Sequence, residues 1–99
     1  MIHLLVLITY DVSTTSEGGK RRLRRVAKKC EDYGVRVQNS VFECIVDAAQ
    51  LKLLEIALEE IIDPTVDSLR FYRLGNNYKN KVKHIGAKES LEVEGPLIF

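Results

Sequence analysis

The chain is poor in the residues that build several familiar kinds of site. It has no tryptophan, one methionine and only two cysteines, Cys30 and Cys44, among 99 residues. Two cysteines cannot make a disulfide framework or a four-cysteine zinc site, and their apolar surroundings predict small core residues. The longest unbroken apolar run, Leu4 to Ile8, has five residues, far fewer than the roughly 18 of a membrane span. We therefore expect a cytoplasmic protein without a signal peptide.

The sequence also lacks a glycine-rich phosphate loop, a serine–histidine–aspartate set and a cysteine–histidine pair at a useful spacing. Hydrophobic residues make up 45% of the chain and charged residues 29%, which predicts a folded globular protein. A length of 99 residues supports one core and leaves no room for a separate catalytic domain. Any chemistry must therefore come from a few side chains on one small scaffold.

The formal net charge of +1 conceals a segregation of charge along the chain. Residues 1–36 contain eight Lys and Arg against four Asp and Glu, residues 37–69 one against seven, and residues 70–99 six against three. The first and last thirds are thus basic and the middle is acidic. This asymmetry favours a polyanion as the partner of one face, although solvated helix surfaces would give the same count.

Hydrophobic periodicity predicts the order strand, helix, strand, strand, helix, strand. The expected strands are residues 2–10, 35–38, 41–46 and 67–74. The expected helices are residues 20–33 and a stretch from the capping box of Asp47 and Gln50 to the residues before Pro64. Two split βαβ units of this kind give an α+β, ferredoxin-like βαββαβ fold in residues 1–77.

Local signals refine this order. The first helix should begin at Thr14 paired with Glu17, or at Ser16 alone. Gly34 stands where a left-handed cap would end that helix. The segment around Asn39-Ser40 fits a hairpin, with a single bulged strand as the alternative.

The predicted helices leave one face of the sheet uncovered, and the first strand is apolar on both faces. An uncovered apolar face predicts a two-fold homodimer. We expect residues 78–99 to form a C-terminal extension, of which residues 78–86 add a strand, in our interpretation, to the partner's sheet.

Asp11 is the residue that points most directly to chemistry. It ends a buried strand in the segment Thr-Tyr-Asp-Val-Ser, so a rigid element holds its carboxylate at the rim of the sheet. Such a carboxylate can ligate a hard cation such as Mg²⁺, or it can form an Asx turn with nearby amides. One aspartate offers too few ligands, but a two-fold dimer presents it twice, and a cation between the two could activate water.

A run of cations occupies the first predicted helix. Seven of the ten residues from 20 to 29 are basic, and no acid lies between Glu17 and Glu31. Helical spacing places these cations around the apolar stripe, which predicts an outward array that binds a phosphate backbone. A merely solvated face usually mixes charges. We assign nucleic-acid contacts to Lys20, Arg21, Arg22, Arg24, Arg25, Lys28 and Arg36.

Three segments together resemble the family of the second CRISPR-associated protein (Cas-two, or Cas2). They are the Leu-Ile-Thr-Tyr-Asp-Val of residues 7–12, the Arg-Val-Gln-Asn-Ser-Val-Phe-Glu of residues 36–43 and the Phe-Tyr-Arg-Leu-Gly of residues 71–75. The resemblance extends over essentially the whole chain. It implies a ferredoxin-like dimer and a metal-dependent endonuclease acting on RNA or double-stranded DNA.

The same resemblance implies that Asp11 holds Mg²⁺, or Mn²⁺ in its place, and that Arg36 and Phe42 match family positions. We assign supporting roles to Tyr10, Ser13 and Phe42. The resemblance further implies a dimer at the centre of the spacer-inserting complex, with the CRISPR integrase (Cas-one) as partner. Three alternatives stay open: a non-catalytic DNA-binding scaffold, a toxin-type ribonuclease of the same fold, and a small-molecule sensor.

Overall fold

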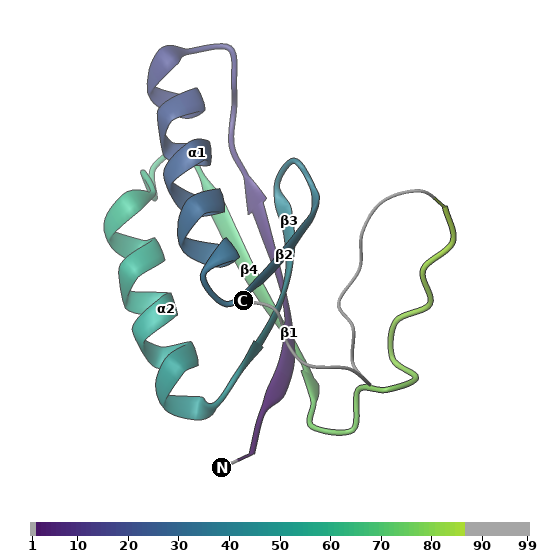
Figure 1. The fold of residues 1–99 in the computed structure, drawn as a ribbon. Helices are drawn as coiled ribbons and strands as arrows, with labels where there is room; N and C mark the ends of the chain where they lie inside the picture. Colours follow the sequence, from purple (N-terminus) through teal and green to yellow (C-terminus); the bar gives the residue numbers. More distant parts are fainter. Residues whose placement is uncertain (1, 87–99) are drawn as a thin grey trace.

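The computed structural model describes residues 2–86, and these form a four-stranded antiparallel sheet with two helices on one face (Figure 1). The element order is the predicted one. The bounds are β1 (Leu4–Asp11), α1 (Glu17–Glu31), β2 (Gly34–Gln38), β3 (Val41–Val46), α2 (Ala48–Ile61) and β4 (Ser68–Gly75). The prediction of an α+β, ferredoxin-like βαββαβ core is confirmed.

β1 lies inside the sheet, whose strand order is β2-β3-β1-β4. It pairs antiparallel with β3, from Leu4 opposite Val46 to Thr9 opposite Val41. It also pairs antiparallel with β4, where Asp11 lies opposite Ser68. Its interior position agrees with its almost continuous apolar sequence, which buries Val6 and Ile8 on one face of the sheet and Leu5 on the other.

The core lies between the sheet and the helices. Val6, Ile8 and Tyr10 alternate inward from β1, and Phe42 and Cys44 do so from β3. Each helix adds one stripe at the predicted spacing, consisting of Val26, Ala27 and Cys30 from α1 and Leu51, Leu54 and Leu58 from α2. Full burial of one large aliphatic side chain contributes about 1.5–3 kcal/mol to folding.

The two cysteines are free and buried, as predicted for core residues. The thiol of Cys44 donates a hydrogen bond to the carbonyl oxygen of Cys30 at 3.6 Å. This contact joins β3 to the end of α1 inside the core.

Both helices begin at side-chain caps. Of the two options for α1, Ser16 is the cap, and its hydroxyl accepts a hydrogen bond from the Gly19 amide at 3.1 Å. The capping box of α2 is complete, because Asp47 and Gln50 each accept the other's backbone N–H, at 2.8 and 2.9 Å. The chain entering each helix is thereby fixed in direction.

The expectation that Gly34 caps α1 in a left-handed conformation is wrong. The cap residue is Asp32, in right-handed geometry, and Gly34 is the first residue of β2. A glycine is needed there for a different reason: a Cβ atom at position 34 would lie 1.9 Å from the carbonyl oxygen of Glu43. Close approach of β2 and β3, and not backbone handedness, excludes a side chain.

The hairpin around Asn39-Ser40 is confirmed, with a register shift between Arg36 and Gln38. The sequence allows either a hairpin or a single bulged strand, and the structure has a hairpin whose first strand contains an irregularity of the bulge type. A bulge increases local twist, which here affects the edge strand β2.

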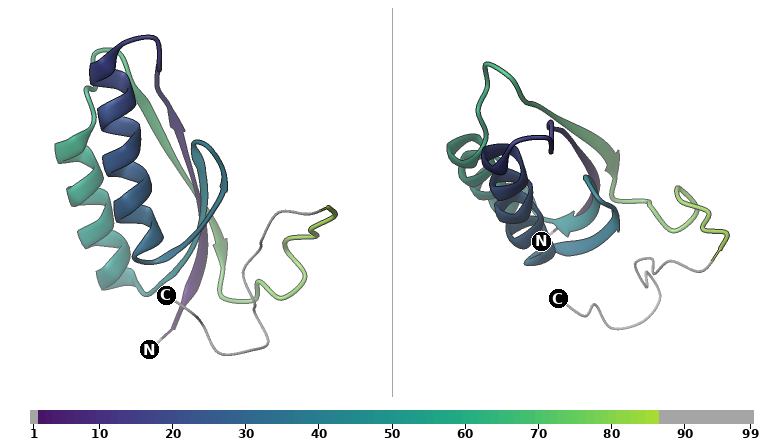
Figure 2. Two further views of the ribbon diagram at one scale, coloured as in Figure 1. Left: turned by 45° about the horizontal axis from the view of Figure 1, so that its top comes forward. Right: turned by 90° about the horizontal axis from the view of Figure 1, so that it is seen from above.

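Residues 76–86 lie on the side of the sheet away from the helices (Figure 2). Within the single chain they form turns and irregular backbone, with no strand between Gly75 and Gly86. The predicted pairing of residues 78–86 with a partner's sheet involves two chains, so it stays a prediction, as does the division at residue 77. The remaining part of the predicted extension, 87–99, lies outside the described residues.

Candidate metal and nucleic-acid site

Asp11 is the last residue of β1, and it is exposed. Because side chains alternate along a strand, Asp11 points to the face opposite its neighbour Tyr10, which is buried under the helices. Across residues 2–86, the Asp11 carboxylate accepts no hydrogen bond from the loop that follows it. The Asx-turn alternative is therefore not what this chain forms.

A single chain supplies few metal ligands. Residues 2–86 hold no group of three or more His, Cys, Asp and Glu that could bind a metal ion. One exposed carboxylate is nonetheless a donor of the right type for Mg²⁺, which keeps several waters and uses one or two carboxylates. The donor set thus fits a cation shared by two chains better than a cation held by one.

The loop after Asp11 packs closely on the start of α1. A Cβ atom on Gly19 would lie 1.7 Å from the carbonyl oxygen of Ser13, so only glycine fits at that position. The Ser13 hydroxyl is exposed and lies 2.9 Å from the hydroxyl of Thr15. Ser13 therefore helps to position this loop through its backbone, while its side chain bonds within the loop.

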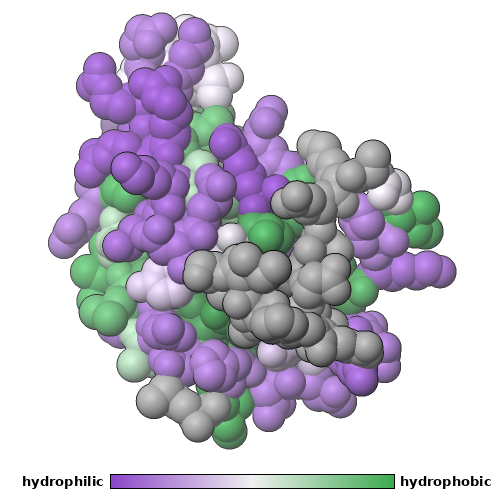
Figure 3. All heavy atoms as spheres, in the orientation of Figure 1, coloured by the Kyte–Doolittle hydropathy of each residue, from purple (hydrophilic) through white to green (hydrophobic). Residues whose placement is uncertain are grey.

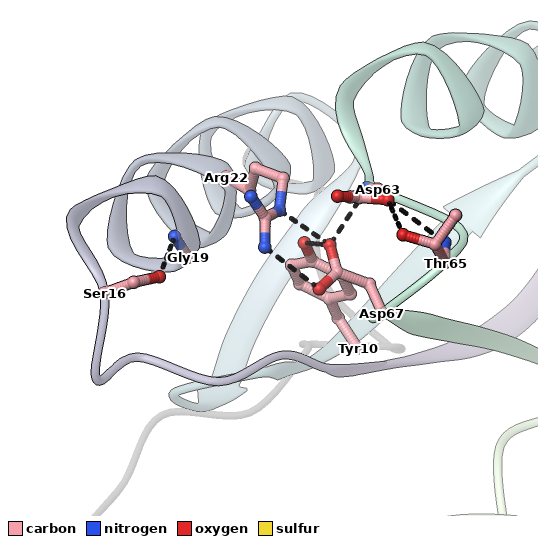
Figure 4. Close-up of polar contacts among 7 residues, drawn as sticks. All are labelled: Tyr10, Ser16, Gly19, Arg22, Asp63, Thr65 and Asp67. Carbon is pink, nitrogen blue, oxygen red and sulfur yellow. Dashed lines mark hydrogen bonds and ion pairs between the residues drawn. The ribbon is translucent and has the colours of Figure 1, made fainter.

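A buried polar network lies on the helix side of the same strand end (Figure 4). The Tyr10 hydroxyl donates to Oδ2 of Asp67 at 2.5 Å. Arg22 of α1 donates from Nε to the same oxygen at 2.8 Å and from Nη2 to Oδ1 at 3.3 Å. The Asp63 amide also donates to Oδ2, at 3.0 Å. Asp67 therefore joins β1, α1 and the turn before β4.

The network shifts the pKa values of its members in opposite directions. Burial and the hydrogen bond to Asp67 raise the pKa of Tyr10 to about 12. Burial alone would raise the pKa of Asp67, but hydrogen bonds from Arg22, Tyr10 and the Asp63 amide outweigh it and lower that pKa. At neutral pH the network therefore consists of a neutral phenol, a carboxylate and a guanidinium.

The structure corrects the expectation that Arg22 faces outward with the other helix cations. Its guanidinium pairs with Asp67, whose side chain is fully buried. The remaining array is exposed along α1, where hydrophilic side chains gather (Figure 3). It consists of Lys20, Arg21, Arg24, Arg25 and Lys28. The sequence does contain a signal that Arg22 lies toward the buried side of the helix, because it precedes the buried Val26 by four residues and so shares its face.

Arg36 and Phe42 lie opposite each other across β2 and β3. The Arg36 guanidinium donates to the Asn39 carbonyl oxygen at 2.9 and 2.6 Å, and it lies 5.9 Å from the centroid of the Phe42 ring. Phe42 is fully buried. Phe42 thus helps to orient the exposed guanidinium at the hairpin, partly through a cation–π contact.

Sequence reasoning misses two buried acids, Asp67 and Glu43. Asp67 stands in the sequence only as the first residue of a predicted strand, and no spacing rule connects it with Arg22, 45 positions earlier. Glu43 is buried on the sheet face away from the helices, and this burial raises the pKa of its carboxyl, although the nearby His84 acts in the opposite direction. An acid in an alternating apolar strand is the available signal for Glu43.

The expected site residues therefore fall into two groups. Asp11 lies on the open face of the sheet, whereas the cations of α1 lie beyond the opposite face. The two groups approach each other only around the rim, where residues 12–16 connect β1 to α1. Tyr10 belongs to the helix side, so its link to Asp11 runs through the backbone.

Comparison with known proteins identifies the family. The family model described as CRISPR associated protein Cas2 matches residues 4–82. The chain belongs to the Cas2 family. A relative from Halalkalibacterium halodurans named CRISPR-associated endonuclease Cas2 is 67% identical over 96 residues, which cover 97% of this chain and all of the relative. A CRISPR-associated endoribonuclease Cas2 of Rhodospirillum rubrum is 57% identical, over 96% of this chain and all of that protein.

Solved Cas2 structures share the fold. The crystal structure of Streptococcus pyogenes Cas2 at pH 6.5 is similar to this chain with a TM-score of 0.76 and 52% identity. The alignment covers 83% of this chain and 99% of that one. Membership of the Cas2 family confirms the resemblance read from residues 7–12, 36–43 and 71–75. Within residues 2–86, no helix is both long enough and apolar enough to cross a membrane.

Proposed function

We propose that this Cas2 chain is one subunit of a two-fold homodimer that hydrolyses phosphodiester bonds of RNA or double-stranded DNA with Mg²⁺. The observation that carries the proposal is the exposed Asp11 carboxylate at the end of the central strand, on the face that no helix covers. The names of the relatives, endonuclease and endoribonuclease, support the same class of reaction.

The apolar side chains on the face that no helix covers support the dimer. Leu5 and Ile45 pair across β1 and β3 on that face and are buried within the chain, while the half-buried Leu7 pairs with Glu43 beside them. Two such faces placed together about a two-fold axis would present Asp11 twice, and an axis that passes close to the ends of the two β1 strands would bring both carboxylates together. A cation between them would offset the repulsion of two like charges.

In this proposal, different residues of the chain hold the metal, fix the strand end and bind the nucleic acid. When bound, Mg²⁺ supplies Lewis-acid polarisation of the phosphodiester and lowers the pKa of a bound water. Asp11 provides oxygen ligands from a rigid strand end. The network of Tyr10, Asp67 and Arg22 fixes that strand end against α1, and the exposed cations of α1 hold the nucleic-acid backbone.

A non-catalytic scaffold is the second candidate, because the exposed cations of α1 are separated from Asp11 by the sheet. In that function the dimer binds duplex DNA and presents it to the CRISPR integrase (Cas-one) during spacer acquisition. Both functions use the same dimer and the same basic surface. They differ in whether Asp11 is required.

The decisive experiment replaces Asp11 in the full-length protein. Asp11→Ala should abolish Mg²⁺-dependent cleavage of RNA or duplex DNA and leave the protein folded, and Asp11→Asn should behave alike because an amide is a poor ligand for a hard cation. Asp32→Ala, which removes another exposed carboxylate, is the matched control and should cleave normally. The metal role would be refuted if Asp11→Ala cleaved as fast as the wild type, or if a chelator did not stop cleavage by the wild type. A wild-type protein that binds duplex DNA but never cleaves would favour the scaffold.

A further inference from the structure

The open face carries a second functional group beside Asp11. In the β1–β4 register, Asp11 lies opposite Ser68, Thr9 opposite Arg70 and Leu7 opposite Tyr72. Directly opposed residues of an antiparallel pair point to the same face, so Arg70 shares the face of Asp11. The two are diagonal neighbours, which lie about 7–8 Å apart with their Cβ atoms somewhat closer. That spacing leaves room for one phosphate group between a carboxylate-bound cation and a guanidinium.

Arg70 differs from Arg22 and Arg73, which both form ion pairs on the helix side of the sheet. Arg22 pairs with Asp67, and Arg73 lies 3.5 Å from the carboxylate of Glu55 on α2. Arg70 is exposed and has no carboxylate within ion-pair distance among residues 2–86. Its side chain is held instead by a neutral group, since Nη1 donates to the Tyr72 hydroxyl at 3.2 Å.

We propose that Arg70, oriented by Tyr72, binds the phosphodiester next to Asp11. The inference rests on the proposed function and adds to it a substrate-binding residue on the same sheet face. A guanidinium has five N–H donors in a planar fork, so the bond to Tyr72 leaves four for a nucleic-acid phosphate. Its charge also compensates the negative charge that a phosphate brings toward a carboxylate. Placement on a paired strand limits the movement of both groups.

Binding tests this interaction without any metal. In chelator, Arg70→Gln should weaken the binding of a short DNA duplex to the full-length protein by about ten-fold, the effect of losing a hydrogen bond to a charged group. The slope of log affinity against log salt should fall by about 0.9 for each phosphate that the variant no longer neutralises. Arg73→Gln is the matched control, because it removes the same charge from the same strand on the other face. Its affinity and slope should stay at the wild-type values.

Two conservative variants separate orientation from charge. Arg70→Lys should keep the salt slope but raise KM in the Mg²⁺ reaction with little change in kcat, because an ammonium cannot make the planar two-point contact. Tyr72→Phe should give a smaller change in the same direction. Equal binding by Arg70→Gln and Arg73→Gln would overturn the proposal. Dissociation of the dimer by Arg70→Gln and by Arg70→Lys would also overturn it, by making Arg70 a subunit contact. Failure of the wild type to cleave would refute the nuclease function alone, since the binding comparison does not require cleavage.

Discussion

The Tyr10 hydroxyl lies 2.5 Å from Oδ2 of Asp67, so the central strand is tied to the turn that precedes the last strand. Tyr10 is adjacent in sequence to Asp11, but its ring points into the core. The hydrogen bond therefore fixes the end of β1 from the helix side and leaves the opposite side of that strand end open. Asp67 is the centre of this arrangement, because it accepts from three other residues.

We expect Asp67→Asn to destabilise the fold strongly. The substitution leaves the Arg22 guanidinium facing a neutral amide in a place where the partner carboxylate was fully buried. Removing one partner of a buried ion pair lowers the free energy of unfolding by about 3–5 kcal/mol. Because Arg22 is partly exposed, we expect a loss near the lower end of this range. The measurement is the free energy of unfolding in urea at neutral pH.

The exposed pair of Lys20 and Glu17 is the control for this prediction. Glu17→Gln removes an ion pair of the same helix at the surface and should change the free energy of unfolding by less than about 1 kcal/mol. If Asp67→Asn were as mild as Glu17→Gln, the network would not determine how β1, α1 and β4 are held together.

The raised pKa of Tyr10 predicts a loss of stability at high pH. The pKa rises from the ordinary value of 10.0 to about 12 in the fold. The folded state therefore favours the neutral phenol, so its contribution is complete below pH 10 and disappears as the pH rises toward 12. Tyrosinate absorbance should show one tyrosine titrating last. Tyr10→Phe should remove that transition and flatten the alkaline decrease in unfolding free energy. A last transition that persists in Tyr10→Phe would contradict the assignment.

Much of the fold is predictable because its signals are local. The stripe of Val26, Ala27 and Cys30 and the capping box of Asp47 and Gln50 depend on residues within one or two helical turns. The central place of β1 could be predicted because an almost continuous apolar run is typical of a strand that is buried on both faces, as interior strands are. These signals require no knowledge of which distant residues meet.

The features that the sequence does not reveal depend on distant contacts. Gly34 fits a cap defined by backbone handedness, whereas the carbonyl of Glu43 on the neighbouring strand decides its identity. Arg22 is one of seven cations on one helix; its spacing from Val26 is a local signal of burial, but its partner Asp67 lies far along the sequence. Asp11 is recognisable because a strand end is a local feature. Its neighbour on the sheet, Arg70, requires the β1–β4 register.

The extension offers a test of the dimer. Residues 76–86 lie on the open side of the sheet, where His84 is close enough to act on the buried Glu43. A strand added from a partner would use the unpaired edge of β4 or β2. Truncation after Gly75 should therefore weaken the dimer, seen as a concentration-dependent mass in sedimentation. Truncation after Gly86 is the control that keeps residues 76–86. If the variant truncated after Gly75 still formed an unchanged dimer at micromolar concentration, the pairing of this segment would be refuted.

The exposed cations of α1 give the last prediction, which separates nucleic-acid binding from a merely soluble surface. Arg21, Arg24 and Arg25 are exposed. Their replacement by Gln retains helix propensity and removes three charges from each subunit. If these residues bind phosphates, the salt slope for duplex DNA should fall by about 0.9 for each phosphate released, measured from about 50 to 200 mM salt. The melting temperature should stay near the wild-type value, because the substitutions remove no buried partner.

Arg22→Gln is the matched control for that triple variant, and it should behave in the opposite way. It removes one charge from the same helix, but the charge is paired with Asp67, so the effect should appear in the melting temperature and hardly in the salt slope. Both the nuclease and the scaffold function require weaker binding by the triple variant, whereas a small-molecule sensor does not. If affinity and slope were unchanged in the triple variant, the duplex would have to bind on the open face instead, where Lys81 and Lys83 of the extension and Arg70 supply exposed positive charge.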